Sequence, residues 1–521
     1  MNTTFNSLRI HRTIGQVALL VVCLVGLSLA LAPAVRAVAP ATTFTVNSTV
    51  DATDANPGDG LCAMPEGGCT LRAGIQEANT LGGPYTYTII LPAGVYILTI
   101  PGPYEDMSVT GDLDIRARIN LQGAGAEQTI IDGNHTVTND RVLDIPLEKR
   151  VTVTGLTIRN GQAEVGGGIR GSSGRLGISD CVLVDNRAVG NGGTGGAIST
   201  IGGYVVIRHS KLTNNYASWE GGVYSGFLSD ITIKGSTLVG NSAGSNGGAI
   251  AGSDVVSIHT SILSDNRAGA HGGAIYQQGG GSATVVITDS TLDGNWATHG
   301  GAIYTYYLGD VNLYDSSLTN NTATFGGAVY DYYFATVTAT NVTLSANTAL
   351  VGGGIYVQEN ASLQLFNATV SGNKAEMGGG LYNQTSVTTM RNTLLAGNTG
   401  SSPDCYGSVT SDGYNLLGNN SGCDFTPAAG DQIGTPDNPI DPLLGPLQDN
   451  GGPTLTHALL PGSPAVDAGD PAGCTDDQGN LLTTDQRGFE RPQDGDGNGS
   501  VICDVGAFEA ESAGLFALFR R

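Results

Sequence analysis

Charged residues are scarce in this sequence, and basic ones are especially few. Only 13% of the 521 residues are charged, with 23 Lys and Arg against 46 Asp and Glu, for a formal charge of −23. That sign argues against nucleic acids and anionic membranes as partners and favours divalent cations. Amphipathic runs of about 10 to 15 residues rich in Ala, Leu, Glu and Lys are missing between residues 155 and 400, which excludes the helical solenoids.

A repeat of about 26 residues fills that region instead. Each unit carries an Asn and then, after a short polar spacer, Gly-Gly-Ala-Ile or a close variant. The asparagines are Asn160, Asn186, Asn215, Asn241, Asn266, Asn295, Asn321, Asn347, Asn373 and Asn398. Between them, apolar and polar residues alternate with many Val, Ile and Thr, which predicts strands of about three to five residues. Two or three such strands per unit describe one coil of a parallel β-helix, with about 4.8 Å between coils.

The repeated glycines and asparagines have structural explanations. Gly in regular structure costs about 0.5 to 1 kcal/mol relative to Ala, so its repetition implies corners that need a positive φ or a backbone approach that a Cβ would block. An Asn amide can donate and accept along the stack. We therefore predict a structural ladder of Asn186, Asn215, Asn241, Asn266, Asn295, Asn321, Asn347 and Asn373, without a binding role.

The first residues have the pattern of an export signal. Arg9 and Arg12 precede an apolar run from 14 to 32 and then small residues, which predicts a signal peptide over 1–37, cleaved after Ala37 or Ala34. An uncleaved anchor is the alternative. We expect an extracellular or cell-surface monomer with no membrane span beyond this segment.

Six cysteines lie outside the repeats as pairs close in sequence. We predict disulfides that staple the irregular ends, although spacing alone leaves the connectivity open: Cys62 with Cys69, Cys405 with Cys423, Cys474 with Cys503. The remaining Cys181 occupies the slot that Ser290 holds in its unit, so we predict a buried small residue.

The two ends differ from the repeats. Leu71, Ile75 and Ala78 share one face of a helix predicted over 69–80, which would cover the first coil as part of an N-terminal cap over 38–100. The β-helix is expected over 101–400. Residues 401–511, rich in Asp, Pro and Gly, are predicted to form an irregular C-terminal cap, followed by a tail over 512–521.

Two terminal motifs resemble known modules. FTVNSTVDATDANPGDGLC and CTLRAGIQEAN closely resemble the CSLREA-type N-terminal module of bacterial exported β-helix proteins, with Thr70 and Ala73-Gly74 as departures. DPLLGPLQDNGGPTLTHALLPGSPAVDAGDPAGC with DQRGFERPQDGDGNGSVICDVGAFE resembles the choice-of-anchor Q domain, and the repeats are similar to those of polymorphic outer-membrane proteins. The resemblance implies an all-β, pectin-lyase-like, right-handed parallel β-helix outside the cell, in a family whose members mostly lack an assigned activity.

Tyrosines recur directly after the Gly-Gly motif and suggest a glycan-binding surface. They are Tyr276, Tyr304, Tyr330, Tyr356 and Tyr382, with Tyr224 once earlier; beside them stand Tyr306, Tyr307, Tyr332, Tyr333 and Phe334. Stacked coils would hold these rings about 5 Å apart, where they could bind sugar faces along a polysaccharide or cell-surface glycan. The alternative is an aromatic ladder with no ligand.

Catalysis has less support. Polysaccharide lyases and hydrolases on this fold need carboxylates clustered over adjacent coils, or acidic calcium ligands beside a basic residue. Asp180 and Asp289 share a position but lie several coils apart, and His271 and His299 lack a third metal ligand. We predict no catalytic residues. The favoured function is an adhesin-like or glycan-binding scaffold; a lyase or glycoside hydrolase and a purely structural envelope protein are the alternatives.

One acidic motif suggests calcium. QDGDGNGS places Asp494, Asp496 and Asn498 at alternate positions, like the first half of an EF-hand loop. The second half lacks the usual Glu, and Asp504 and Glu509 are the candidate substitutes. A solvated acidic turn is the alternative, and no other cofactor is predicted.

Overall fold

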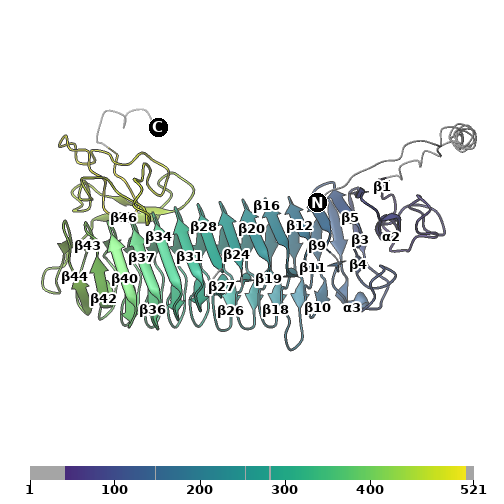
Figure 1. The fold of residues 1–521 in the computed structure, drawn as a ribbon, viewed down its shortest axis with the longest axis horizontal. Coiled ribbons are helices and arrows are strands. Elements are labelled where there is room, and N and C mark those ends of the chain that lie inside the picture. The colour runs from purple at the N-terminus through teal and green to yellow at the C-terminus, as the bar shows by residue number, and fades with distance from the viewer. Residues whose placement is uncertain (1–41, 147, 253, 281–282, 512–521) are drawn as a thin grey trace, which may run out of the picture. The chain divides into compact units, whose positions relative to one another are not determined.

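The computed structural model describes residues 42–146, 148–252, 254–280 and 283–511. The predicted signal peptide and the tail over 512–521 lie outside the described residues. Within them, almost all regular structure is β-strand, and parallel strands stack coil upon coil (Figure 1). The predicted all-β parallel β-helix of about 26 residues per coil is therefore confirmed.

Three strand positions recur in every coil, and each builds one parallel sheet. Sheet 1 contains β1 (Thr43–Thr45), β2 (Thr86–Leu91), β5 (Arg118–Gly123), β8 (Arg150–Thr154), β12 (Arg175–Ser179), β16 (Tyr204–Arg208), β20 (Asp230–Lys234), β24 (Val255–His259), β28 (Thr284–Thr288), β31 (Asp310–Tyr314), β34 (Thr336–Thr340), β37 (Ser362–Phe366), β40 (Val387–Arg391), β42 (Cys405–Ser411) and β44 (Cys423–Thr426).

Sheet 2 is built from shorter strands: β3 (Gly94–Ile97), β6 (Thr129–Asp132), β9 (Thr157–Arg159), β13 (Val182–Val184), β17 (Lys211–Thr213), β21 (Thr237–Val239), β25 (Ile262–Ser264), β29 (Thr291–Asp293), β32 (Ser317–Thr319), β35 (Thr343–Ser345), β38 (Thr369–Ser371), β41 (Leu394–Leu395), β43 (Leu416–Leu417) and β45 (Gln432–Ile433). A corner sheet beside it holds β10 (Gln162–Ala163), β14 (Arg187–Ala188), β18 (Tyr216–Ala217), β22 (Ser242–Ala243) and β26 (Arg267–Ala268).

Sheet 3 follows the Gly-Gly motif and joins sheet 1 through β42. Its other strands are β4 (Leu113–Asp114), β7 (Leu143–Ile145), β11 (Ile169–Ser172), β15 (Ile198–Ile201), β19 (Tyr224–Phe227), β23 (Ile250–Gly252), β27 (Ile275–Gln278), β30 (Ile303–Tyr306), β33 (Val329–Tyr332), β36 (Ile355–Gln358) and β39 (Leu381–Gln384). Inward Ile, Leu and Val of all three sheets form one continuous buried core.

The two glycines of each motif serve different needs. Gly272 has φ +62°, which L-residues rarely adopt. At Gly273 a Cβ would stand 2.0 Å from the carbonyl oxygen of Gly301 on the next coil. The first glycine therefore makes the turn, and the second allows the coils to approach.

The buried asparagines form a hydrogen-bonded ladder. The backbone N–H and Nδ2 of Asn295 both donate to Oδ1 of Asn321, at 2.9 Å each, and Nδ2 also donates to the Leu263 carbonyl. The same bonds run from Asn186 to Asn373, and Asn398 donates to Asp404 instead.

Asn160 does not belong to the ladder. It has φ +56°, and its amide donates to the Asp132 carboxylate, while the backbone N–H of Gly161 donates to Asn186 in the ladder position. The repeat alignment of Asn160 with the ladder asparagines was therefore wrong by one residue, because Gly161 occupies the ladder position. An Asn can also occupy the left-handed corner that precedes that position.

The three predicted disulfides are confirmed: Cys62–Cys69, Cys405–Cys423 and Cys474–Cys503. Cys181 is buried and unpaired, and its backbone N–H donates to Ser210 Oγ, as that of Ser210 does to Ser236. It therefore fills one place in a column of serines.

Helix α2 (Leu71–Leu81) packs on β2. Thr70 caps its N-terminus, since the Thr70 hydroxyl accepts a hydrogen bond from the N–H of Ala73. A short helix, α3 (His135–Thr138), interrupts a later coil. Among the described residues, no helix is long and apolar enough to cross a membrane.

The C-terminal segment lies along the flank of the coils. Strands β42 to β45 extend the stack to residue 433, and residues beyond 440, with the antiparallel pair β46 (Leu444–Gln448) and β47 (Thr456–Leu459), run back beside β34 and β37 (Figure 1). Hydrogen bonds from Thr343 to Gln486 and between Ser345 and His457 attach them to sheet 2.

Candidate functional site

The tyrosine column lies on the outer face of sheet 3. Strand register aligns Tyr276, Tyr304, Tyr330, Tyr356 and Tyr382, and Tyr406 continues the line. Neighbouring ring centroids are 4.8 to 5.7 Å apart and the ring planes are within 21° of parallel. Each ring therefore covers its neighbour's face, and the column presents mainly ring edges and hydroxyls outward.

Burial of this column changes its chemistry. Tyr276, Tyr304, Tyr330 and Tyr356 are all buried, and burial raises the pKa of Tyr276 and of Tyr356 to about 12. The hydroxyl of Tyr330 donates to Gln358 and that of Tyr356 to Gln384, on the following coils. These contacts describe a stabilising aromatic ladder.

Tyr224 is not in this column. It pairs in register with Ile198 and Ile250, which face the core, and its side chain is fully buried. Its hydroxyl lies 3.1 Å from that of Thr200. The motif Gly-Gly-Val-Tyr lacks one residue relative to Gly-Gly-Ala-Ile-Tyr, so Tyr224 takes the inward position of the Ile.

A second aromatic group is open to solvent at the turns between sheets 3 and 1. We call residues 306–308 and 332–334 the aromatic turns. The rings of Tyr307 and Tyr333 are 5.9 Å apart, and those of Tyr306 and Tyr332 are 5.5 Å apart. Tyr307, Tyr333 and Phe334 are 46%, 36% and 49% exposed. The aromatic turns thus offer accessible aromatic surface, which the buried column does not.

Both aromatic turns have an unfavourable backbone. Tyr307 and Leu308 have φ +56° and +61°, and Tyr333 and Phe334 have φ +55° and +57°. Bulky residues are rare in this region, which costs on the order of 1 kcal/mol or more per residue. The equivalent residues one coil later are Glu359 and Asn360, so the turn itself does not require aromatic side chains.

The predicted histidine pair belongs to the aromatic stack. The rings of His271 and His299 are 5.1 Å apart, and His271 also contacts Tyr304 at 4.5 Å. Burial, and then the neighbouring His299, lower the pKa of His271 to about 4. Neither acidic group that could hold a metal among the described residues includes these histidines.

The predicted calcium residues are only partly brought together. Asp494 and Asp496 lie with Asp467, with one oxygen of each within 4.8 Å of the others, and the Asn498 amide donates to Asp496. Asp504 is buried beside this group but is not part of it, and its carboxylate accepts the backbone N–H groups of Asp467 and Ala510. The Asp504 carboxylate is thus occupied by backbone hydrogen bonds, and the third carboxylate of the acidic group comes from Asp467.

The structure also reveals carboxylates on adjacent coils that the sequence search missed. Asp114 pairs in register with Asp144, and Asp144 with Arg170. The signal in the sequence is a repeated Leu-Asp-Ile at 113–115 and 143–145, which precedes the regular repeats.

Comparison with known proteins supports the scaffold. Residues 229–399 match the family described as right handed beta helix region. No curated protein matches the chain. Together with the parallel stacked sheets, this match shows a right-handed β-helix scaffold.

Proposed function

We propose that this right-handed β-helix is an exported, adhesin-like scaffold that binds glycans through its aromatic turns. The single observation that carries the proposal is the pair of exposed tyrosines, Tyr307 and Tyr333, held on adjacent coils by backbone conformations that bulky residues disfavour. Unfavourable conformations at exposed residues indicate a functional requirement, since they add nothing to the core.

The chemistry of the aromatic turns fits a sugar chain. Aromatic rings bind the C–H faces of pyranose rings, and each ring adds about 0.5 to 1.5 kcal/mol beyond the buried area. Two carboxylates lie near the aromatic turns, those of Asp310, two residues after Leu308, and of Glu359, on the coil after Tyr333. They can accept hydrogen bonds from sugar hydroxyls. Tyr306 and Tyr332 of the aromatic turns pack against the buried tyrosine column.

Export is part of this proposal. Three disulfides are typical of an oxidising compartment. The resemblance to CSLREA-type, choice-of-anchor Q and outer-membrane repeat proteins points to the same location, outside the cell or on its surface.

A second candidate is a polysaccharide lyase or glycoside hydrolase. It is favoured by one observation, the column of Asp114, Asp144 and Arg170 on three successive coils, which matches the arrangement that such chemistry needs. This column lies many coils from the aromatic turns, so the two functions can be tested separately.

The test is retention on an array of neutral and acidic glycans by the full chain and by a Tyr307→Ser, Tyr333→Ser double variant. We expect the variant to lose retention while its thermal unfolding changes little, because both side chains are exposed. Tyr85→Ser, at a tyrosine 40% exposed and outside the aromatic turns, is the matched control. Undiminished retention by the double variant would refute the proposal, and released reducing or unsaturated ends would support the second candidate.

A further inference from the structure

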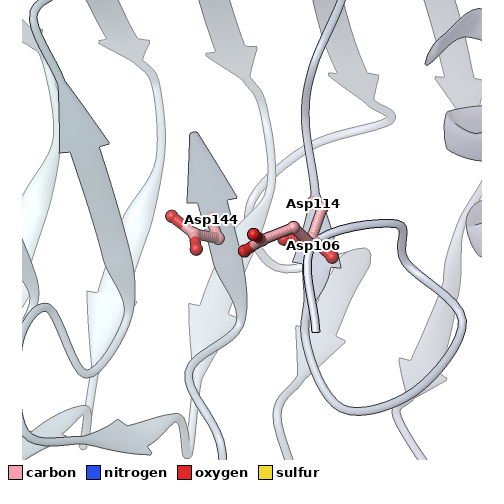
Figure 2. A group of neighbouring side chains, drawn as sticks. All are labelled: Asp106, Asp114 and Asp144. Atoms are coloured by element: carbon pink, nitrogen blue, oxygen red, sulfur yellow. The ribbon is translucent and has the colours of Figure 1, made fainter. Parts of the chain in front are cut away.

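Three aspartates from separate segments meet near the N-terminal end of the β-helix. Asp114 ends β4, Asp144 lies in β7 on the next coil, and Asp106 comes from the loop before β4. Each contributes one carboxylate oxygen, and these three oxygens lie within 4.8 Å of one another. Figure 2 shows the three side chains. Like charges at such distances repel, so the arrangement needs a compensating group.

Asp114 has an oxygen that no protein group satisfies. The side chain is fully buried, and Oδ1 has no hydrogen-bond partner among the described residues, whereas Oδ2 accepts the backbone N–H of Ser108 at 2.7 Å. Leaving a buried acceptor unpaired costs about 1 to 3 kcal/mol, and more for a charged group.

The nearby arginines do not supply that partner. Arg170 donates to both carboxylate oxygens of Asp144, through Nε at 2.9 Å and through Nη2. Arg141 Nη1 donates to Asp112 at 2.9 Å and to Asp144 at 3.4 Å. No guanidinium hydrogen-bonds to the Asp114 carboxylate in the described parts of the chain. Acidic groups outnumber basic ones around the site. The six carboxyl groups are those of Glu105, Asp106, Asp112, Asp114, Asp140 and Asp144, and the three guanidinium groups are those of Arg116, Arg141 and Arg170.

We propose that Asp106, Asp114 and Asp144 bind a divalent cation of the Ca²⁺ type. Calcium takes oxygen ligands at about 2.3 to 2.6 Å, so two ligands of one ion lie at most about 5 Å apart, a limit that the three carboxylates meet. A cleft of about 450 Å³, lined by Asp106, Arg141, Asp144 and Arg170, leaves space for water to complete the coordination.

The loop that carries Asp106 is already held in position for this role. The Ser108 hydroxyl donates to the Asp114 carbonyl and accepts the Asp114 N–H, at 2.9 and 2.7 Å. The cation would therefore join this loop to two coils of the β-helix. The site is distinct from the acidic group of Asp467, Asp494 and Asp496, and the inference does not depend on glycan binding.

The test is calorimetric titration of the full chain with CaCl₂, after treatment with a chelator. We expect saturable binding with a dissociation constant on the order of 10⁻⁴ to 10⁻³ M, as in other extracellular calcium sites. Asp114→Asn and Asp106→Asn should each weaken it about tenfold or more, as loss of a charged ligand does. Asp106 is exposed, so its variant is expected to fold even if that of Asp114 does not.

Asp496→Asn is the matched control, because it removes one carboxylate from the other acidic group. We expect Asp496→Asn to leave unchanged the calcium binding that Asp114→Asn and Asp106→Asn weaken. The proposal is overturned if the wild type shows no saturable heat up to about 10 mM CaCl₂, well above the expected range. It is equally overturned if Asp106→Asn binds like the wild type, or if Asp496→Asn alone abolishes binding.

Discussion

Asp331→Asn should stabilise the protein, and increasingly so as the pH rises from 5 to 7. Asp331 lies at an inward position of β33, between Thr305 and Val357 on the neighbouring coils. Its side chain is fully buried, and neither carboxylate oxygen has a hydrogen-bond partner among the described residues. Burial, with a smaller effect of Asp310, raises the pKa of Asp331 well above its usual value.

The size of the effect follows from proton binding. With a folded-state pKa well above that in the unfolded chain, about 3.9, the folded protein keeps a proton that the unfolded chain loses. The unfolding free energy then falls by about 1.4 kcal/mol per pH unit above pH 4 until the folded carboxyl ionises. Between pH 5 and 7 the loss is at most about 2.7 kcal/mol, which is that slope over two pH units. Asn has the shape of protonated Asp and no such dependence.

The assay is urea unfolding of wild type and Asp331→Asn at pH 5 and pH 7. Other buried carboxyls, such as Asp112 and Asp114, affect both proteins equally, so the change in the difference between them isolates Asp331. Asp437→Asn, at an exposed loop, controls for the loss of one negative charge. An equal difference at both pH values would mean that Asp331 is ionised in the folded state, and would refute the reasoning.

Two further changes test the repeat, and a third tests the C-terminal segment. Gly273→Ala puts a Cβ 2.0 Å from the Gly301 carbonyl oxygen. It should lower the unfolding free energy, measured by urea unfolding, by about 3 kcal/mol or more, or prevent folding. A cost below about 1 kcal/mol would contradict the close approach of the coils. Asn295→Ala leaves the backbone N–H of Asn266 and the Leu263 carbonyl without their partner. The unfolding free energy is expected to fall by about 2 to 4 kcal/mol. The control Asn312→Ala on sheet 1 should lower it by less than about 1 kcal/mol. Replacing Cys474 and Cys503 together by Ser should lower stability by about 2 to 4 kcal/mol and expose residues beyond 440 to protease first, whereas uniform cleavage of the coils would argue against a separate C-terminal unit.

The repeat could be predicted because its constraints are local and periodic. The Asn and the Gly-Gly that follows it recur because every coil meets the same neighbours, above and below, at the same corner. The errors occurred where one residue was inserted or missing. Asn160 occupies a left-handed corner, and Tyr224 moves inward, because a shift of one residue reverses the direction of a strand side chain.

The candidate sites depended on information that the sequence does not contain. Tyrosines at one-coil spacing were predicted to form a column, but their spacing cannot say whether a ring shows its face to solvent or to the next ring. The left-handed backbone and exposure of Tyr307 and Tyr333 distinguish the aromatic turns from that column. Likewise, Asp504 is close to Asp496 in sequence yet caps backbone N–H groups, while Asp467 joins from a separate segment.

The sequence by itself determined the coil, its period and the reason for two glycines in each unit, because each follows from one unit contacting its own copy. Only the tertiary structure decided which groups from unlike segments meet. Asp106, Asp114 and Asp144 lie in irregular early coils of different lengths, and the register that aligns them depends on how each loop folds. Contacts between unequal segments carry no period, so they become visible only in three dimensions.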